Sequence, residues 1–211
     1  MSSRLRVLCF GDSNTWGYIP ITGGRYPDQI RWTGRLAGNP DFDIIEEGLN
    51  GRTTAFVDHL EPFRCGLDYV VPCLLSHFPL DVVIVMLGTN DTKRRYNVSA
   101  PEIARGLEEV IIRVQEFCRR KDQYPEFVII SPARIAITED VDFDQASVAK
   151  VLGLEAEYRA LAEQYGCRYL KASDYVTDIG QDGVHLTETG HKNLADAIEQ
   201  LLLDLKSQAN K

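Results

Sequence analysis

The sequence predicts a protein of the α/β class, in which a parallel sheet lies between two layers of helices. Short runs rich in β-branched residues alternate along the chain with longer segments of helical periodicity. No repeat, linker or low-complexity segment interrupts this alternation, and 211 residues are enough to bury a full core. We therefore expect a single domain over residues 1–211 with a three-layer α/β/α architecture.

Five short apolar runs are the expected strands of the sheet. They lie at residues 5–10, 42–46, 82–87, 127–131 and 168–170. Helical segments between successive strands are typical of parallel pairing through crossover connections. We expect the flavodoxin-like strand order 2-1-3-4-5, in which the first strand lies between the second and the third.

The segments between the strands have the length and pattern of helices. They lie at residues 32–37, 67–77, 101–121 and 143–165, the third with a proline near its first turn. The final helix has the clearest pattern, with one apolar stripe of Leu194, Ala195, Ile198, Leu201, Leu202 and Leu205. Thr187 is placed to cap its start. Residues 17–28, rich in glycine, proline and tyrosine, are expected to form an ordered loop over the sheet edge.

Charge and cysteine content exclude several classes of protein. The 31 acidic and 23 basic residues give a net charge of -8 and are scattered along the chain, so nucleic acid is not an expected partner. The five cysteines form no C-x-x-C pair, which favours reduced thiols without disulfides or structural zinc. With neither a signal-peptide pattern nor a membrane-spanning run, we expect a soluble, cytoplasmic protein that binds no membrane.

Polar segments follow the strands that this order brings together. Residues 11–13 (Gly-Asp-Ser), 48–51 (Gly-Leu-Asn-Gly) and 88–91 (Gly-Thr-Asn-Asp) come after the first three strands. Residues 182–185 (Asp-Gly-Val-His) come after the last. Ligands bind at the carboxyl ends of the strands in such sheets, so we expect the four segments to converge on one crevice.

A serine, a histidine and an aspartate at that edge indicate nucleophilic catalysis. A hydroxyl is a weak nucleophile until a base takes its proton and an acid orients the base, and Ser13, His185 and Asp182 are the candidates for these roles. The backbone N–H groups of Ser13 and Gly51 and the side chain of Asn90 are candidate donors to an oxyanion. Taken one at a time, these residues also fit ordinary turns, where glycine and asparagine satisfy the backbone.

Of the four histidines, only one can be the base. His59 and His77 are expected away from the crevice, either solvated or packed. His191 ends a D-x-x-H-x-x-E-x-x-H string that begins at Asp182 and could be interpreted as a metal site. Residues three apart spread around a helix, however, so we predict no metal ligands in this string. Catalysis by Ser13, His185 and Asp182 also requires no metal and no cofactor. The G-x-S-x-G elbow, the P-loop and the G-x-G-x-x-G pattern are absent.

In these motifs the chain resembles the SGNH hydrolases, also called GDSL esterases, which are named after a serine, a glycine, an asparagine and a histidine. Ser13, Gly51, Asn90 and His185 match these positions in order. The bacterial arylesterases with acyltransferase activity are the most similar branch, through residues 9–13, 31–34, 46–49, 52–54 and 86–93. The resemblance covers nearly the whole chain.

That resemblance implies the SGNH hydrolase fold and a serine ester hydrolase that acts without a cofactor. The expected substrates are short-chain aryl or alkyl esters, cleaved through an acyl intermediate on Ser13, with acyl transfer to alcohols as a further outcome. It also implies a homo-oligomer, for which Tyr18, Tyr26 and Phe63 are candidate interface aromatics.

Two parts of the chain depart from the family pattern. Asn14 stands where the family name implies leucine, and residues 137–150 match nothing, which leaves one side of the acyl or alcohol pocket undefined. Trp16, Tyr18 and Trp32 are expected near the crevice, where they would line an apolar substrate pocket. Ordinary packing explains these three aromatics equally well.

Other functions remain open at this point. A carbohydrate O-deacetylase, a lysophospholipase or a thioesterase would use the same catalytic residues, because pocket shape selects the ester. A non-catalytic flavodoxin-like binding module is the alternative from another class. Such a module needs no serine, histidine and aspartate set and would not turn over an activated ester.

Overall fold

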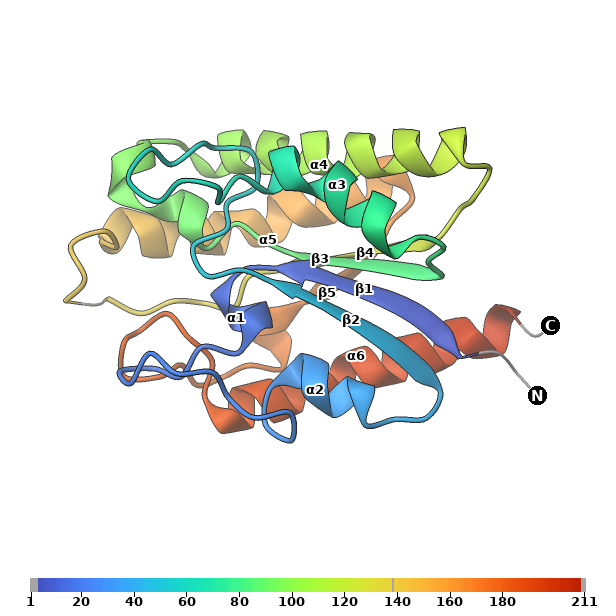
Figure 1. Cartoon of the computed structure of the whole chain (residues 1–211). Coiled ribbons are helices and arrows are strands. Elements are labelled where there is room, and N and C mark those ends of the chain that lie inside the picture. The colour runs from blue at the N-terminus through green and yellow to red at the C-terminus, as the bar shows by residue number, and fades with distance from the viewer. Residues whose placement is uncertain (1–3, 138, 210–211) are drawn as a thin grey trace.

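Across the residues that the computed structural model describes, 4–137 and 139–209, five parallel strands form one sheet (Figure 1). The strands are β1 (Leu5–Gly11), β2 (Phe42–Gly48), β3 (Val82–Met86), β4 (Glu126–Ser131) and β5 (Arg168–Lys171). Their order is β2-β1-β3-β4-β5, and every neighbouring pair is parallel. The predicted strands and their order are confirmed.

Helices cover both faces of the sheet, as predicted. One face carries α3 (Gly66–His77), α4 (Ala100–Arg120) and α5 (Gln145–Tyr165), and the other carries α2 (Trp32–Ala37) and α6 (Glu188–Ala209) (Figure 1). Short helical turns add α1 (Ser13–Trp16), η1 (Asn90–Thr92), η2 (Arg94–Tyr96) and η3 (Ala172–Asp174). These turns were not predicted, because three or four residues show no periodicity.

Side chains cap the starts of the long helices. Ser99 and Glu102 form a capping box at α4, in which the Glu102 carboxylate accepts the N–H of Ser99 at 2.7 Å. The hydroxyl of Thr187 accepts the N–H of Gly190 at 3.0 Å, which confirms the predicted cap of α6. These bonds satisfy N–H groups that have no partner within a helix.

Alternation along the strands supplies two apolar cores, one on each face. Leu8, Phe10, Val83 and Val85 pack with α3, α4 and α5, whereas Val7, Cys9, Ile84 and Met86 pack with α2 and α6. The predicted stripe of α6 faces the second core, with Leu194, Ala195, Ile198, Leu202 and Leu205 buried and Leu201 half-buried. Both faces of the central strands are therefore covered.

The central strands end at one level. In the pairing register, Gly11 at the end of β1 lies opposite Gly48 of β2 and Met86 of β3. The segments that follow these strands consequently leave the sheet at the same carboxyl-terminal edge. This arrangement places the polar segments named above.

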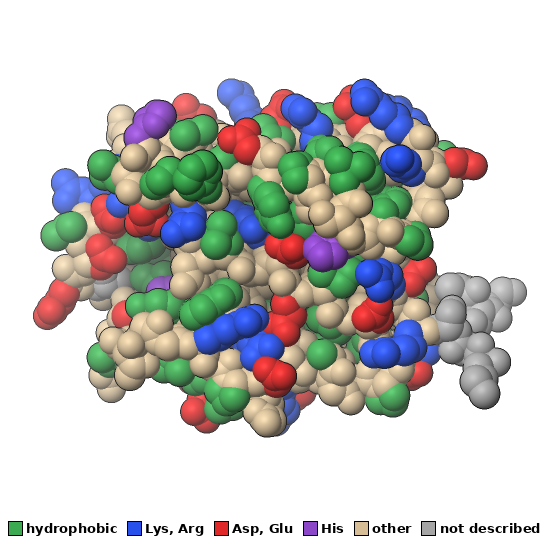
Figure 2. Space-filling view, in the orientation of Figure 1, with side chains coloured by type: hydrophobic (Ala, Val, Ile, Leu, Met, Phe, Trp, Pro, Cys, Tyr) green, Lys and Arg blue, Asp and Glu red, His purple; other side chains and the backbone are tan. Residues whose placement is uncertain are grey.

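The surface carries charges of both signs. Basic and acidic side chains are intermingled over the face shown in Figure 2. The cysteines are all free, and four of the five are buried. Within the described part of the chain, no helix combines the length and apolarity needed to cross a membrane.

Candidate active site

Ser13 is the first residue of α1, directly after β1. Asp12 caps this single turn, since its side chain accepts the N–H of Asn14 at 2.9 Å. Gly11 is required by close packing, because a Cβ there would lie 2.0 Å from the hydroxyl of Thr15. The turn therefore holds the Ser13 side chain at the carboxyl edge of the sheet.

The Ser13 hydroxyl belongs to a continuous series of hydrogen bonds. Nε2 of His185 lies 2.8 Å from Oγ of Ser13, and Nδ1 of His185 lies 2.7 Å from Oδ2 of Asp182. The other Asp182 oxygen accepts the backbone N–H groups of Val184 and His185, each at 3.0 Å. The structure thus brings together three residues that are up to 172 positions apart.

Asp182 is ionised at neutral pH. Its partial burial alone would raise its pKa, but the hydrogen bonds from the His185 ring and from the backbone N–H groups of His185 and Val184 lower it to about 2. An anionic carboxylate favours the tautomer with a proton on Nδ1 of His185. Nε2 is then left with a lone pair directed at the serine hydroxyl.

Asn14 joins the serine turn to the histidine segment. Its Oδ1 accepts the N–H of Leu186 at 3.0 Å, and its Nδ2 donates to the carbonyl of Val184 at 3.4 Å. These bonds fix the backbone on both sides of His185 relative to Ser13. The sequence singled out Asn14 only as a departure from the family name, although an amide beside the serine is a usable signal for such a role.

Asn90 and Gly51 lie on the two neighbouring segments of the same edge. Nδ2 of Asn90 donates to the carbonyl of Arg52 at 3.1 Å, which uses one of the two amide protons. Gly51 has a φ of 78°, and a Cβ there would lie 2.5 Å from Oε2 of Glu61. The left-handed conformation of residue 51 therefore favours glycine, whereas the nearby Glu61 carboxylate is the end of a flexible side chain that can move aside.

Asp91 fastens these two segments together. Its Oδ1 accepts both the backbone N–H of Thr54, at 2.8 Å, and the Thr54 hydroxyl, at 2.6 Å. Asp91 is fully buried, and this burial raises its pKa to about 6. Sequence reasoning missed this residue; the available signal was a carboxylate directly after Asn90 at the end of an apolar strand.

A depression of about 580 Å³ opens beside the histidine. Tyr18, Ile137 and Phe143 line it together with Asp182 and His185. The Tyr18 ring centroid lies 4.3 Å from that of His185. Ile137 and Phe143 belong to the part of the chain that matches no motif of the family, and they form part of the wall of this depression.

Two aromatic predictions are wrong. Trp32 does not line the pocket, because its side chain is fully buried in the core and its indole N–H donates to the carbonyl of Asn14 at 3.1 Å. Tyr26 is not a surface aromatic, since it is 9% exposed and packs edge-on against the ring of His191. Trp16 is half-buried, with its ring beside that of Tyr18. Packing of α2 against α6 accounts for the burial of Trp32.

His191 lies in this same buried region. Its side chain is 0% exposed, and its Nδ1 accepts the N–H of Trp32 at 3.3 Å. Burial, followed by the nearby charge of His185, lowers the pKa of His191 to about 3. The imidazole is therefore neutral and acts as a packing group.

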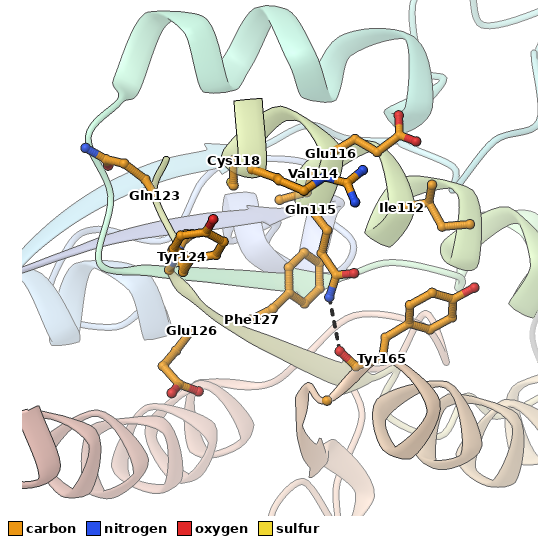
Figure 3. A pocket seen from close by; sticks show the side chains of 13 residues that line it. Ile112, Val114, Gln115, Glu116, Cys118, Gln123, Tyr124, Glu126, Phe127 and Tyr165 are labelled. Atoms are coloured by element: carbon orange, nitrogen blue, oxygen red, sulfur yellow. Dashed lines mark hydrogen bonds between the residues drawn. The ribbon is translucent and has the colours of Figure 1, made fainter. Parts of the chain in front are cut away.

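Another hollow, shown in Figure 3, lies at the opposite edge of the sheet. It has a volume of about 490 Å³ and is lined by residues of α4, the start of β4 and the end of α5, including Tyr124, Phe127 and Tyr165. It contains none of the predicted site residues. The chemistry-bearing side chains are thus concentrated at the carboxyl edge.

Comparisons with known proteins agree on one family. The sequence model of the GDSL-like Lipase/Acylhydrolase family matches residues 9–192. None of the curated proteins compared with the chain matches it. Among solved structures, the aryl esterase of M. smegmatis is 35% identical, with a TM-score of 0.89, and the match covers 95% of this chain and 99% of that chain.

Two further structures show the same likeness. Est24, described as a carbohydrate acetylesterase from Sinorhizobium meliloti, is 35% identical with a TM-score of 0.90, over 96% of this chain and 100% of that chain. A putative arylesterase from Agrobacterium tumefaciens is 32% identical with a TM-score of 0.86, over 95% and 99% of the two chains. These matches extend over nearly the full length of both partners.

Proposed function

This chain belongs to the GDSL-like lipase/acylhydrolase family and has the SGNH hydrolase fold, and we propose that it is a serine esterase acting on short-chain esters of aryl or alkyl alcohols. The observation that carries the proposal is the hydrogen-bonded series from Ser13 through His185 to Asp182. A serine hydroxyl that donates to an oriented imidazole is activated for attack on an acyl carbon. The likeness to aryl esterases supports the choice of ester.

In the acylation step, Oγ of Ser13 attacks the ester carbonyl carbon while its proton passes to Nε2 of His185. The carbonyl oxygen becomes an oxyanion, and Asp182 stabilises the imidazolium. His185 then gives the proton to the alcohol oxygen as the carbon–oxygen bond to the alcohol breaks. The acyl group remains on Ser13.

The proposed oxyanion donors are the backbone N–H groups of Ser13 and Gly51 and the side chain of Asn90. Asn90 gives one amide proton to Arg52, so its second proton is available for the substrate. Ser13 begins α1, and the first N–H groups of a helix have no partner within that helix. The bonds from Thr54 to Asp91 hold the two segments in place before substrate arrives, which reduces reorganisation during the reaction.

Water completes hydrolysis, and an alcohol that takes its place completes acyl transfer. The apolar wall formed by Tyr18, Ile137 and Phe143 would bind the hydrocarbon part of an alcohol and offer water little. We therefore include acyl transfer in the proposal. An aryl acetate supplied with a primary alcohol should give the alkyl acetate beside acetate; acetate as the sole product at every alcohol concentration would withdraw this part.

A second substrate class is acetylated carbohydrate. It is favoured by the likeness to Est24 and by polar groups, Gln181 and Glu139, among the residues that line the depression. Such groups can hydrogen-bond to sugar hydroxyls, whereas an aryl group needs only the apolar wall. The two classes share every catalytic step and differ in the alcohol bound.

A panel of esters tests the proposal. An aryl acetate, an acetylated sugar, an acyl thioester and a lysophospholipid would be compared with the wild type and with Ser13→Ala. We expect the highest kcat/KM for the short aryl ester and no turnover of any substrate by the variant. Preference for the sugar ester would select the second class, and no turnover by the wild type would favour a binding module.

We also propose a homo-oligomer, with the cytoplasm as its expected location. The loop between β2 and α3 exposes Val57, Leu60 and Phe63, and Phe63 is 91% exposed. Hydrophobic side chains gather over this loop in Figure 2. Light scattering should give a multiple of the chain mass of 23.8 kDa, and the mass of a single chain would contradict the proposal.

A further inference from the structure

Helix α3 carries a cysteine and a histidine on the face that it turns toward β2. Cys73 and His77 are four residues apart, and Tyr69 precedes Cys73 by the same interval, so the three share one helical stripe. Glu47 of β2 lies opposite this stripe. One ligand atom each of Glu47, Cys73 and His77 lies within 4.8 Å of the other two.

The Glu47 carboxylate is the common acceptor of this cluster. Its Oε1 lies 2.8 Å from Nε2 of His77 and accepts the Tyr69 hydroxyl at 3.4 Å. The Cys73 thiol is fully buried, and this burial, together with the charge of Glu47 and a hydrogen bond to it, raises the pKa of the thiol to about 12. The thiol and the imidazole N–H thus direct their protons toward one carboxylate.

We propose that Glu47, Cys73 and His77 form a binding site for zinc(II), separate from the catalytic residues. Carboxylate oxygen, thiolate sulfur and imidazole nitrogen are the three ligand types that zinc takes from proteins. The side chains of Glu47 and His77 are 18% and 27% exposed, so a water molecule can reach the fourth position. This site differs from the prediction of no metal ligands, which weighed only the string from Asp182 to His191. Cys73 and His77 were not considered, since Glu47, which completes the set, lies on another element.

The distances are compatible with a tetrahedral ion after small side-chain rotations. Zinc bonds of about 2.0–2.3 Å place neighbouring ligand atoms roughly 3.3–3.6 Å apart. The Glu47–His77 pair, at 2.8 Å, must open slightly, and any pair near the 4.8 Å limit must close by about 1.2–1.5 Å. His77 is the last residue of α3 and its side chain is 27% exposed, so its ring can rotate toward solvent.

Binding exchanges protons for the metal without any redox change. The S–H bond of Cys73 breaks, its proton passes to the buffer, and bonds form from zinc to Sγ, to Nε2 of His77 and to Oε1 of Glu47. The proton that His77 carries on Nε2 toward Glu47 leaves to solvent and Nδ1 takes one up, so the ring stays neutral and coordinates zinc through Nε2. The thiolate and the carboxylate together balance the two positive charges of the ion.

Arg52 places a positive charge beside the proposed zinc site. Its guanidinium lies 3.9 Å from Oε2 of Glu47 and 5.2 Å from the Tyr69 ring centroid. It faces the carboxylate oxygen that the metal does not use, which leaves Oε1 for zinc. Its positive charge weakens binding relative to an all-anionic site, and the thiolate still favours zinc over magnesium or calcium.

The test is a metal titration of the full-length chain, reduced and freed of metal beforehand. Zinc would be titrated against a chromophoric chelator, and cobalt(II) would serve as a spectroscopic probe. We expect one ion per chain and a thiolate-to-cobalt charge-transfer band. Cys73→Ser and His77→Ala should each weaken zinc binding by more than roughly 100-fold, because losing a ligand costs more than losing a supporting partner.

Matched controls exist for each change. Cys118→Ser removes a buried thiol of α4, and His59→Ala removes an exposed imidazole; both should bind zinc like the wild type. Ser13→Ala should also bind zinc normally while losing esterase activity. His77 lies partly exposed at a helix end, so its variant reports on the site even if the Cys73 change disturbs the core. Wild-type affinity no greater than that of the Cys73→Ser/His77→Ala double variant would overturn the proposal.

Discussion

His185 and His191 lie six residues apart in the chain and occupy opposite environments. The His185 side chain is 17% exposed, and its two nitrogens lie between Asp182 and Ser13. The His191 side chain is 0% exposed, and among the described residues its Nε2 has no hydrogen-bond partner. Both imidazoles occur in the same regularly spaced string of ligand-type residues.

The two environments show that an imidazole alone does not make a general base. A base must become charged during the reaction, so a carboxylate has to stabilise its protonated form. Asp182 supplies that charge for His185. His191 is buried without such a carboxylate, and burial disfavours its protonated form. The pKa of His191 is lowered to about 3, and the ring stays neutral.

Replacing the proposed base should have the largest effect. His185→Ala should lower kcat/KM for an aryl acetate by roughly 10⁴-fold or more, because the serine loses its proton acceptor. His191→Asn is the matched control, since its side-chain oxygen can still accept the Trp32 N–H. Steady-state kinetics on both variants checks the assignment. Equal losses of kcat/KM in the two variants would contradict the assignment of His185, and not His191, as the base.

Removal of the side-chain oxyanion donor should cost less. Asn90→Ala should lower kcat by about 10²- to 10³-fold with a smaller change in KM, as expected when one donor to a developing oxyanion is lost. Single-turnover kinetics would separate the acylation step from substrate binding. An unchanged kcat would mean that Asn90 only stabilises the backbone of the turn in which it lies.

A still smaller effect is expected at Asn14, which connects the serine turn to the His185 segment. Asn14→Ala leaves the Leu186 N–H and the Val184 carbonyl without this partner, at a cost of about 1–3 kcal/mol in the free energy of unfolding. Misplacement of His185 should lower kcat by roughly 10- to 100-fold. Urea denaturation and kinetics measure both quantities, and full activity in the variant would show that the imidazole is positioned without Asn14.

His191→Asn should have the smallest effect on activity and a specific effect on stability. The folded-state pKa of His191, about 3, lies below its ordinary value of 6.5, so between these values the unfolded chain binds a proton that the folded chain does not. The free energy of unfolding of the wild type therefore falls as pH drops through this window, by up to about 1.4 kcal/mol per pH unit.

The variant lacks this contribution and should lose less stability over the same window. Groups that act in the opposite direction, such as Asp12 and Asp91 with pKa values raised by burial, are common to both proteins and cancel in the difference. Denaturant unfolding at a series of pH values gives the two curves. Parallel curves would mean that His191 is protonated in the folded protein.

Elements long enough to show a period were predictable from the sequence. The strands follow from short apolar runs rich in β-branched residues, and the apolar stripe of α6 follows from a period of about 3.6 residues. The strand order follows from the alternation of strands with helices, which is typical of the flavodoxin-like arrangement. The single turns that carry Ser13 and Asn90 were not predictable, because so few residues show no period. The polar segments were nevertheless placed at one edge, because each of them follows a parallel strand.

Contacts between distant side chains were beyond the reach of the sequence. The bonds from Asn14 to the segment around His185, and from Thr54 to Asp91, join residues separated by 37 to 172 positions. Trp32 was misplaced because six residues of α2 do not reveal which face meets the core. The partner of Cys73 and His77 lies on another element, so their spacing alone carried no indication of a site.

The most direct test of the central claim is covalent labelling with a fluorophosphonate, followed by peptide mass mapping. We expect one label per chain, on Ser13, in the wild type and in His191→Asn, slow labelling in His185→Ala and none in Ser13→Ala. A label on another serine, or rapid labelling of Ser13 without His185, would contradict the assignment of Ser13 as nucleophile and His185 as its base.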